Sequence, residues 1–316
     1  MRTNCLLRLF IDGYAIVHYP INGIKYVHDE ERMAKVATQF AQSSCGIMNG
    51  CIGALDRWVV KIKKPSRDKD NVSEPSSFYS RKGYFGLNVQ CIVDKQKRVL
   101  FRTIKSRGAE HDSTAFKNSH LYKYMMKNCM SLCNKGYYFI GDSAYALKSF
   151  LLTPYDNAFH GTPEDNYNYS HSSSRISVEC AFGEVDLCWG IFWKPLKYTL
   201  KTNCKIIDAC LHLHNFIVDH REGLAMDDID KSVFDDECRR VFAVQPDIEG
   251  VMGGESDICR NPDGSIARGG RPTTTDAQST AIGKDWRDKH RDEIARRNHV
   301  RPRNNWFRER NRVHST

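Results

Sequence analysis

Three features are missing from the sequence, and each absence excludes a class of protein. No run of eighteen apolar residues occurs, so there is no candidate membrane-spanning helix. The opening residues, MRTNCLLRLFIDGY, are too short and too interrupted an apolar stretch for a signal peptide with a cleavage site. The twelve cysteines are scattered singly with no CxxC pair, which favours reduced thiols over a disulfide framework. We therefore expect a soluble intracellular protein that does not associate with membranes.

The composition supports one catalytic-sized domain with further segments at both ends. The chain has 316 residues, of which 41% are hydrophobic, enough to bury a full core with residues left over. We predict a short helical lead-in over residues 1–50, a main domain over 51–222 and a flexible, largely disordered tail over 223–316. The tail is sorted by charge: residues 223–263 hold eleven acidic and four basic side chains, whereas residues 280–316 hold eleven basic and five acidic ones.

Two short features of the tail suit nucleic-acid binding, and each has an ordinary alternative. The sequence RGGRP (268–272) is similar to a minor-groove arm with arginines beside a Gly-rich turn, although a plain flexible linker is the commoner explanation. The last segment interleaves Trp286, Trp306 and Phe307 with arginines, which suits base stacking but equally fits a partly helical solvated end.

Positive charge is concentrated in one part of the main domain. Residues 57–107 contain fourteen Lys and Arg against four Asp and Glu, a local excess of +10 in a chain whose net charge is +9. Such a run is commonly a solvated face, but it also suits a surface that follows a phosphate backbone.

Hydrophobic patterning predicts an α/β domain. Three segments rich in β-branched and aromatic residues indicate consecutive antiparallel strands, of which the last two are joined by a hairpin. A helical pattern and a fourth strand follow, then a polar loop over residues 155–173 and two more helices. The predicted strands are 51–62, 83–94, 98–106 and 137–142, and the predicted helices are 109–130, 174–189 and 204–220.

Three acidic residues stand in apolar surroundings, where an unpaired charge is costly. Asp56 lies inside the first strand, Asp142 ends the fourth strand beside small residues, and Glu179 lies on the helix after the polar loop. Crevices open at the carboxyl ends of strands in α/β sheets, so a shared ligand site is one interpretation. Each also has a structural alternative: Asp142 could cap a turn, and Asp56 could pair with Arg57 or a lysine. Glu179 could form an i, i+4 pair with Arg175.

The three carboxylates suggest a metal site. Carboxylates from two strands and a helix can hold two Mg²⁺ or Mn²⁺ ions, which prefer oxygen ligands. A pair of such ions about 4 Å apart activates water and stabilises the leaving oxygen in phosphodiester cleavage. Zinc is a weaker hypothesis: Cys210, His212 and His214 lie close in sequence, but i and i+2 side chains of one helix point away from each other.

Six long motifs span most of the region between about residue 30 and residue 220. They are GCIGALD, FYSRKGYFGLNVQCIVD, RGAEHDSTAFKNS, YFIGDSAYALKSFLLTPY, YNYSHSSSRISVECAFG and IIDACLHLHNFI. In order and spacing they resemble the PIF/Harbinger transposase family and its domesticated nuclease relatives. The resemblance implies an RNase H-like fold, a mixed five-stranded sheet flanked by helices, and metal-dependent DNA cleavage of transposase type. It also implies that Asp56, Asp142 and Glu179 form the catalytic triad and hold the metal.

Further family positions fall on charged residues of this chain. His111 and Asp112 match an element that follows the third strand, where they could orient substrate or support the metal site. Asp112 could equally cap the next helix. For the basic residues we favour phosphate or DNA-strand contacts, with ordinary surface charge as the alternative. The candidate DNA-binding residues are Lys61, Lys63, Lys64, Arg81, Lys82, Arg107 and Arg175.

The chain departs from the family pattern beside two of the triad residues. Relatives usually have glycine and threonine after the first aspartate, where this chain has Arg57 and Trp58, a cation and a large ring beside the expected metal site. After Glu179, acidic Glu184 and Asp186 stand where relatives are basic, and Asp186 could add a carboxylate. A catalytically weak or inactive DNA-binding or scaffold protein on the same fold is therefore the alternative function.

The resemblance also sets expectations for partners and location. Relatives commonly pair the nuclease domain with a helix-turn-helix DNA reader or with a separate protein that reads the target. Only about fifty residues precede Asp56, and residues 29–44 match a short family helix, so we expect the reader to be absent or truncated. DNA, a sequence-specific DNA-binding partner protein, a homo-oligomer and a nuclear location, reached by import from the cytoplasm, follow as predictions.

Overall fold

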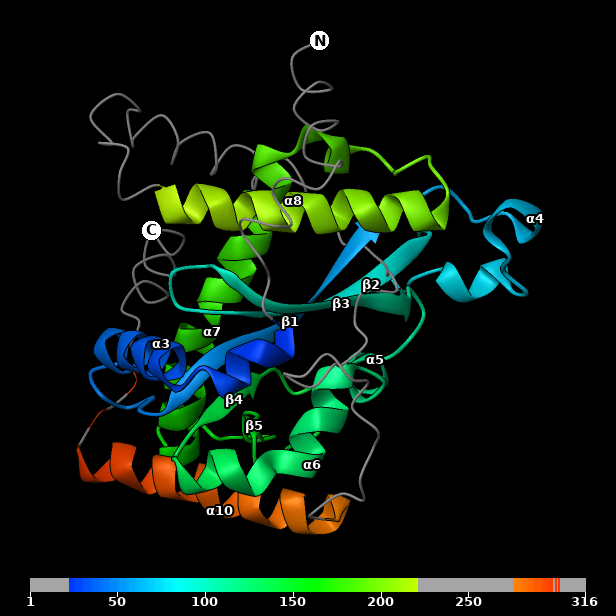
Figure 1. Cartoon of the computed structure of the whole chain (residues 1–316). Helices are drawn as coiled ribbons and strands as arrows, with labels where there is room; N and C mark the ends of the chain where they lie inside the picture. The colour runs from blue at the N-terminus through cyan, green and yellow to red at the C-terminus, as the bar shows by residue number, and fades with distance from the viewer. Residues whose placement is uncertain (1–22, 221–274, 298, 300, 302–316) are drawn as a thin grey trace, which may run out of the picture.

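A mixed sheet forms the centre of the protein. The computed structural model describes residues 23–220, 275–297, 299 and 301. The sheet has five strands in the order β3-β2-β1-β4-β5, as Figure 1 shows. Strand β1 is antiparallel to β2 and parallel to β4, β2 is antiparallel to β3, and β4 is parallel to β5. The strands are β1 Cys51–Lys61, β2 Gly86–Val93, β3 Val99–Arg107, β4 Tyr138–Gly141 and β5 Leu151–Leu152. The predicted mixed five-stranded sheet is thereby confirmed.

The hairpin between β2 and β3 forms as its spacing predicts. Asp94 closes it, because its carboxylate accepts a hydrogen bond from the Arg98 backbone N–H at 2.9 Å. Lys97 takes a φ of 72° in the turn. All eight residues of β2 are buried, since helices or strands cover both of its faces and both of its edges are paired.

The single helix predicted over residues 109–130 is wrong, because two helices occupy that stretch. They are α5, Asp112–Lys117, and α6, His120–Asn134. Ser119 separates them: its hydroxyl accepts a hydrogen bond from the Tyr122 backbone N–H at 3.1 Å and caps α6. Apolar residues at helical spacing continue across the break, so the pattern alone does not reveal it.

Helix α7, Pro163–Cys188, begins well inside the predicted polar loop and corrects the predicted boundary at residue 174. The Thr162 hydroxyl accepts a hydrogen bond from the Asp165 backbone N–H, and proline occupies the first turn, both of which are ordinary start signals. The buried face of the first half consists mostly of polar residues, Ser170 and Ser174 among them, with Tyr167 as its one large ring. Hydrophobic periodicity is therefore weak there, although the helix is continuous.

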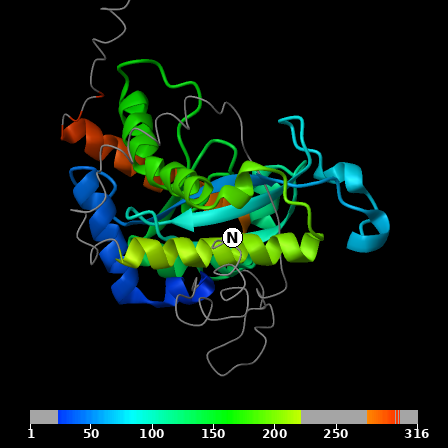
Figure 2. The same cartoon turned by 90° about the horizontal axis from the view of Figure 1, so that it is seen from above.

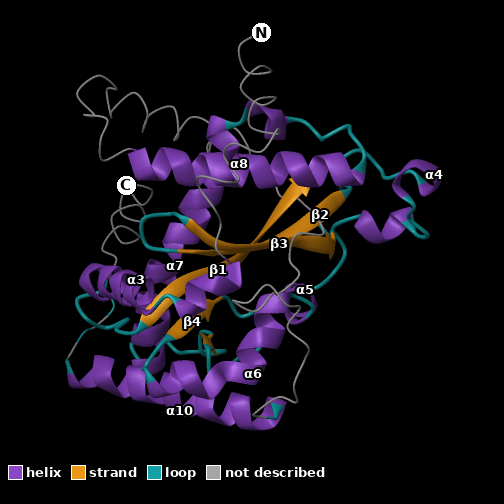
Figure 3. Ribbon diagram, viewed as in Figure 1, coloured by secondary structure: helices purple, strands orange, loops and turns teal. Residues whose placement is uncertain are grey.

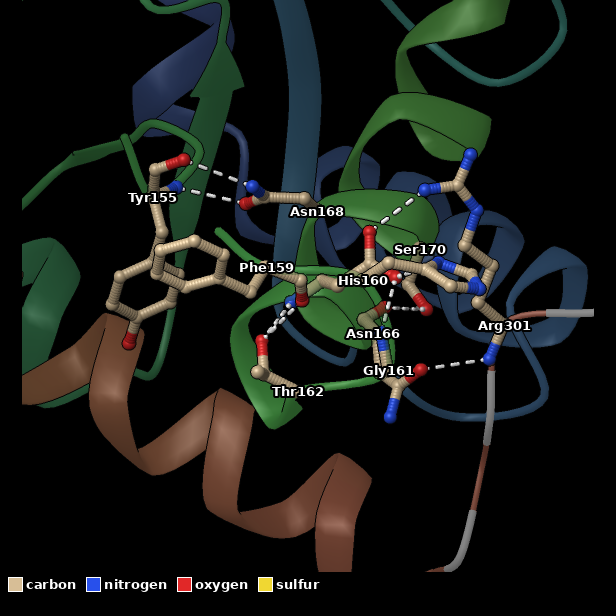
Figure 4. A network of polar contacts seen from close by, with 10 residues as sticks. Tyr155, Phe159, His160, Gly161, Thr162, Asn166, Asn168, Ser170 and Arg301 are labelled. Carbon is tan, nitrogen blue, oxygen red and sulfur yellow. Dashed lines mark hydrogen bonds and ion pairs between the residues drawn. The ribbon is translucent and has the colours of Figure 1, made fainter. Parts of the chain in front are cut away.

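The start of α7 is fixed by polar contacts from two distant segments (Figure 4). Tyr155 and Asn168 exchange two hydrogen bonds, from the Tyr155 backbone N–H to the amide oxygen at 2.8 Å and from the amide nitrogen to the Tyr155 carbonyl at 2.9 Å. Arg301 donates through its guanidinium to Asp165 at 2.7 Å and through its backbone N–H to the Asn166 amide oxygen at 2.8 Å. These contacts matter for the site, because α7 carries both Arg175 and Glu179.

The remaining helices surround the sheet. Helix α3, Glu30–Ser43, packs against β1 and is capped by Asp29, in agreement with the short family helix expected there. Helix α8, Leu200–His220, contacts β3 and α7, and lies at the opposite end of the molecule from helix α10, Asp276–Arg296, in Figure 1. Figure 2 views the molecule from the side of α8. Figure 3 shows the strands enclosed between these helices. The short helices are η1 Gly23–His28, α4 Arg67–Asp70, η2 Pro75–Phe78 and η3 Gly190–Trp193.

Helix α10, Asp276–Arg296, lies within the segment predicted to be a flexible tail and corrects that prediction for its own length. Thr275 and Gln278 form a capping box at its start. The helix packs against α7, α6 and β5, and buries Ser279, Gly283 and Ile294. We call this contact the α10 seam. RGGRP and the residues Trp306 and Phe307 lie outside the described residues.

Two general expectations can be compared with the described part of the chain. All nine described cysteines are free thiols. None of the described helices is sufficiently long and apolar to cross a lipid bilayer.

Candidate active site

Strand register brings Asp56 and Asp142 to neighbouring positions in the sheet. In the parallel pair of β1 and β4, Leu55 is paired with Gly141, and the two aspartates are the next residues along each chain. The negative charge of Asp142 contributes to a raised pKa of Asp56. We call Asp56, Asp142, Glu179 and the cation Arg175, which contacts the first and the third of them, the carboxylate edge.

Asp56 is held by two hydrogen bonds. The Arg175 guanidinium donates to its Oδ2 at 2.6 Å, and the Arg57 backbone N–H donates to its Oδ1 at 2.7 Å. Burial raises the pKa of Asp56 to about 6, even though Arg175 and the Arg57 N–H act to lower it, and the nearby charge of Asp142 raises it further. Because ionising the Asp56 carboxylate is costly, an additional cation beside it would stabilise the ionised form.

Glu179 joins the same cation from the solvent side. Its Oε1 lies 3.5 Å from Arg175 Nη2, and its side chain is 58% exposed. One guanidinium therefore lies between the first and third of the predicted catalytic carboxylates. The alternative of an i, i+4 pair between Glu179 and Arg175 is confirmed, whereas Asp56 pairs with Arg175 instead of Arg57 or a lysine.

Asp142 begins a tight turn at the end of β4. Its Oδ1 accepts a hydrogen bond from the Ala144 backbone N–H at 3.0 Å, and its carbonyl accepts one from the Tyr145 N–H at 3.3 Å. The expected turn-capping contact is thus present. Asp142 remains partly exposed beside the exposed Ser143, so one carboxylate oxygen can meet both the turn and a ligand.

Sequence reasoning missed a buried polar chain behind this turn. The Tyr145 hydroxyl donates to Gln90 Oε1, Gln90 Nε2 donates to Asn88 Oδ1 at 2.6 Å, and Asn88 Nδ2 donates to Asp112 Oδ1 at 3.2 Å. Arg57 Nη1 completes the chain at 3.1 Å from Asp112. Asn88 and Gln90 are fully buried on β2. The available signal was their presence inside the otherwise apolar strand GLNVQCIV, where buried polar groups need partners.

The side chains of Arg57 and Trp58 have partners outside the carboxylate edge, contrary to the expectation from their position next to Asp56 in the sequence. Arg57 is engaged by Asp112, and Trp58 is 3% exposed, stacked on Phe182 at 5.9 Å with its other neighbour Phe192 at 5.0 Å. Trp58 is therefore a core residue. Asp112 is not the cap of α5, because His111 occupies the N-cap position and Asp112 is the first helical residue.

Asp186 lies away from the carboxylate edge. Burial raises its pKa to about 7, and the indole of Trp58 acts in the opposite direction. We find no contact of Asp186 with Asp56, Asp142 or Glu179 among the hydrogen bonds and ion pairs of the described residues, so its expected role as an extra carboxylate has no support.

The candidate DNA-binding residues lie in three places. Arg81 contacts the His111 ring, with its Nη2 3.0 Å from Nε2, and both side chains are exposed. Lys82 and Arg107 are also exposed. Arg175 is at the carboxylate edge, and its buried Nε has no hydrogen-bond partner among the described residues. The cluster of Lys61, Lys63 and Lys64 lies at and just beyond the end of β1.

The donor chemistry of the carboxylate edge fits a divalent cation. Asp56 lies beside Asp142 in the sheet and shares the Arg175 guanidinium with Glu179, so positive charge already stands at two of the three carboxylates. Over residues 23–220 and 275–297, no three His, Cys, Asp or Glu side chains are already grouped to hold a metal ion. Metal binding would therefore require Arg175 to move from Asp56. His214, part of the weaker zinc hypothesis, contacts the Lys97 carbonyl at 2.7 Å.

Curated relatives are similar to part of this chain. "Protein ALP1-like" of Arabidopsis thaliana is 27% identical over 210 residues, covering 62% of this chain and 49% of that protein. "Putative nuclease HARBI1" of Rattus norvegicus is 29% identical over 181 residues, covering 55% and 47%, and its Homo sapiens counterpart is 26% identical over 210 residues, covering 65% and 56%. The chain thus spans about half the length of these relatives. No solved structure matches it.

The family comparison agrees with the motifs. The model of the family described as DDE superfamily endonuclease matches residues 55–215, just over half of the 316 residues. The match begins one residue before Asp56 and includes Asp142 and Glu179. Together with the curated relatives it confirms the resemblance to Harbinger-derived proteins, and the chain belongs to the DDE superfamily endonuclease family.

Proposed function

We propose that this protein is a metal-dependent DNA endonuclease of transposase type, with Asp56, Asp142 and Glu179 as its catalytic carboxylates. The proposal includes an RNase H-like fold, for which the strand order β3-β2-β1-β4-β5 with β1 at its centre is the support. The printed names of the rat and human relatives describe nucleases, which agrees with the proposal.

The observation that carries the proposal is the grouping of two carboxylates around Asp56: Asp142 lies beside it in the sheet, and Glu179 shares the Arg175 guanidinium with it. Asp56 and Asp142 follow paired residues on neighbouring parallel strands, and Glu179 reaches the same guanidinium as Asp56 from α7. Packing gives no reason to place a second acidic group beside Asp56, because burial already raises the pKa of Asp56 and the charge of Asp142 raises it further.

The three carboxylates would hold two Mg²⁺ or Mn²⁺ ions. When bound, such ions supply a nucleophilic water at neutral pH and stabilise the charge on the leaving oxygen. Asp56 and Asp142 fix the position of their oxygens through the Arg57 and Ala144 backbone N–H groups. Glu179, the most exposed of the three, is free to adjust its position.

Arg175 has two roles in this proposal. In the metal-free protein it neutralises Asp56 and Glu179. Once displaced from Asp56, its guanidinium offers donors to a phosphate oxygen, and its buried Nε already lacks an acceptor among the described residues. Asp112 would support the site through the buried chain that joins it to the Asp142 turn, and the exposed His111 would orient substrate beside Arg81.

The biological setting remains part of the proposal. The substrate would be DNA, bound with the help of a sequence-specific partner protein, and a homo-oligomer would bring two sites to two DNA ends. The protein would act in the nucleus. The chain spans about half the length of its curated relatives, so the activity of those whole proteins is a proposal for this chain.

Plasmid cleavage tests the proposal. Supercoiled DNA is incubated with the full chain and Mg²⁺ or Mn²⁺, with EDTA as the blank, and wild type is compared with Asp142→Asn. The exposed Asp156→Asn is the matched control, and circular dichroism establishes that all three proteins are folded. We expect nicking by wild type and Asp156→Asn only. Equal nicking by Asp142→Asn would refute the assigned triad.

A non-catalytic DNA-binding or scaffold protein is the second candidate function. The observation in its favour is that Arg175 already satisfies Asp56 at 2.6 Å, as a permanent ion pair would. The same experiment separates the two: absence of metal-dependent nicking by wild type, with DNA binding retained, supports the second candidate.

A further inference from the structure

A lysine-rich segment outside the candidate active site has no assigned role. Residues 187–207 contain four lysines and no acidic residue. Two aromatic side chains in this segment project into solvent, Trp193 with 55% and Tyr198 with 59% of its surface exposed. Large exposed rings carry a hydration cost, so their grouping among lysines points to a binding surface.

Main-chain pairing joins this segment to the end of β1. Leu196 donates its N–H to the Lys61 carbonyl at 2.9 Å and accepts from the Lys63 N–H at 2.8 Å, so that Ile62 and Leu196 form a parallel bridge. Ile62 and Leu196 are both buried. Because side chains alternate along extended chains, Lys63 and Lys197 follow the bridge on its other, exposed side.

Aromatic rings also order the lysines on the other side of β1. Lys61 Nζ lies 4.8 Å from the centre of the Tyr84 ring, and Lys64 Nζ lies 5.7 Å from that of Phe85. Phe85 contacts the half-exposed ring of Tyr79 at 5.1 Å. Aromatic rings and lysines therefore lie together on both sides of the end of β1.

Trp193 is held in place with its ring available. Its Nε1 donates to the Asp186 carbonyl at 2.7 Å, which satisfies the only polar atom of the indole. Gly190 lies beneath the ring, where an added Cβ would sit 3.6 Å from it. A fixed ring loses little conformational entropy on binding, which suits stacking.

The surface lies within reach of the candidate active site along one strand. Lys61 is five residues beyond Asp56 on β1, about 17 Å at 3.3 Å per residue. That length corresponds to about five steps of one strand in a duplex at 3.4 Å per step, and to fewer nucleotides of a more extended unpaired strand.

We propose that Lys63, Lys64, Trp193, Lys194, Lys197 and Tyr198, here called the lysine–aromatic surface, bind unpaired DNA a few nucleotides from the cleaved bond. This inference rests on the proposed function. Lysines bind the phosphate backbone of any nucleic acid. Exposed aromatic rings contribute base stacking only where the bases are unpaired, and in an intact duplex they are not. The surface therefore takes a single-stranded extension or an opened DNA end.

Binding in EDTA tests the surface independently of cleavage. Fluorescence anisotropy of the full chain is measured with a labelled twenty-nucleotide oligo(dT) and with a blunt duplex of the same length. Variants are Trp193→Ala with Tyr198→Ala, and Lys194→Ala with Lys197→Ala. The exposed Phe159→Ala and Lys284→Ala, on other parts of the molecule, are the matched controls. Thermal melting establishes that each variant is folded.

We expect the aromatic pair to weaken oligo(dT) binding about tenfold or more, with little effect on the duplex. The lysine pair should lower the slope of log K against log salt for oligo(dT) by about 1.4, or 0.7 per phosphate contact. Unchanged oligo(dT) binding in the aromatic pair would overturn the inference. Equal losses for oligo(dT) and duplex would also overturn it, since they indicate backbone contact alone.

The two proposals fail separately. Asp142→Asn should bind oligo(dT) as wild type does. Selective oligo(dT) binding through Trp193 and Tyr198, without plasmid nicking by wild type, would leave the surface standing and refute the endonuclease. Normal nicking by wild type, with oligo(dT) binding unchanged in the aromatic variant, would support the endonuclease and refute the lysine–aromatic surface.

Discussion

At the carboxylate edge Asp56 and Glu179 share one guanidinium and Asp142 lies beside Asp56, whereas at the α10 seam the cations have separate acceptors or an aromatic ring as partners. Lys148, only 2% exposed, contacts Asp276 at 3.0 Å and Thr280 at 2.6 Å. Arg287 donates to the Pro154 carbonyl at 3.0 Å and lies 4.0 Å above the Tyr155 ring. At the seam, Lys148 and Arg287 have partners within the protein, although Arg287 Nε and His290 Nε2 have no hydrogen-bond partner among the described residues. At the edge, negative charge is left in excess.

The difference teaches which region is built for packing and which for ligand binding. Satisfied buried groups stabilise a seam and tolerate little change. Excess negative charge lowers the stability of the fold unless a cation binds. Such destabilising charge is typical of sites that bind a ligand. Substitutions should therefore separate the two regions, the edge affecting cleavage and the seam affecting unfolding.

The largest expected effect is on cleavage at the edge. Glu179→Gln keeps the size of the side chain and removes its charge, so metal-dependent nicking should fall about 100-fold or more. The melting temperature should not change, because the side chain is 58% exposed. Initial nicking rates and thermal melting are measured with Glu31→Gln, an exposed α3 glutamate, as control. Nicking within twofold of wild type would contradict the comparison.

The next effect is on stability at the seam. A Cβ at Gly283 would meet the Lys148 carbonyl oxygen at 2.5 Å and the Ser149 nitrogen at 3.1 Å, both backbone atoms that cannot turn aside. Gly283→Val should lower the free energy of unfolding by about 1–3 kcal/mol and the melting temperature by about 3–8 °C. Nicking per folded molecule should be retained.

Ala281→Val on the exposed side of α10 is the control for helix propensity. If Gly283→Val and Ala281→Val melted together, α10 would not be packed as described.

The two regions should also respond to pH with opposite sign. The pKa of Asp56 is raised to about 6, so between its ordinary value and pH 6 the folded state binds more protons than the unfolded state. The free energy of unfolding should therefore fall by about 1–3 kcal/mol as pH rises through that range. Asp56→Asn should remove this slope, measured by urea unfolding in EDTA.

His290 at the seam has the reverse effect. Burial lowers its pKa to about 4, although the Ile47 backbone and Glu293 act to raise it. Between about pH 4 and 6.5 the unfolded state binds more protons, so stability falls as pH falls. His290→Gln should flatten that acid limb by about 1–3 kcal/mol. Slopes unchanged in both variants would show that neither group is buried as found.

The smallest expected effect separates two contacts within the seam. The Tyr155 hydroxyl donates to Asp288, while the ring lies beneath Arg287. Tyr155→Phe removes the first contact and keeps the second, and should lower the free energy of unfolding by about 1 kcal/mol. Tyr155→Leu, which removes both, should cost more. Equal costs would assign the stabilisation to the hydroxyl alone.

Much of the fold could be predicted because the residue pattern within each short segment determines its secondary structure. The β-branched runs of β1, β2 and β3 and the hairpin spacing at Asp94 match the structure closely. The helix break at Ser119 and the start of α7 could not be read from periodicity, since apolar spacing crosses the first and small polar residues line the second. The three acidic residues and the pairing of Glu179 with Arg175 were predicted, but the contact of Arg175 with Asp56 and the buried support through Asn88, Gln90 and Tyr145 were not.

The sequence by itself determined the strands, most of the helices and the three acidic positions, because alternation, capping and charge in apolar surroundings act over a few residues. Only the tertiary structure decided which cation faces Asp56, 119 residues away, and that a helix after residue 275 closes onto Lys148, 132 residues from its partner Thr280. Such contacts form when packing brings distant surfaces together, and no local pattern encodes the partner.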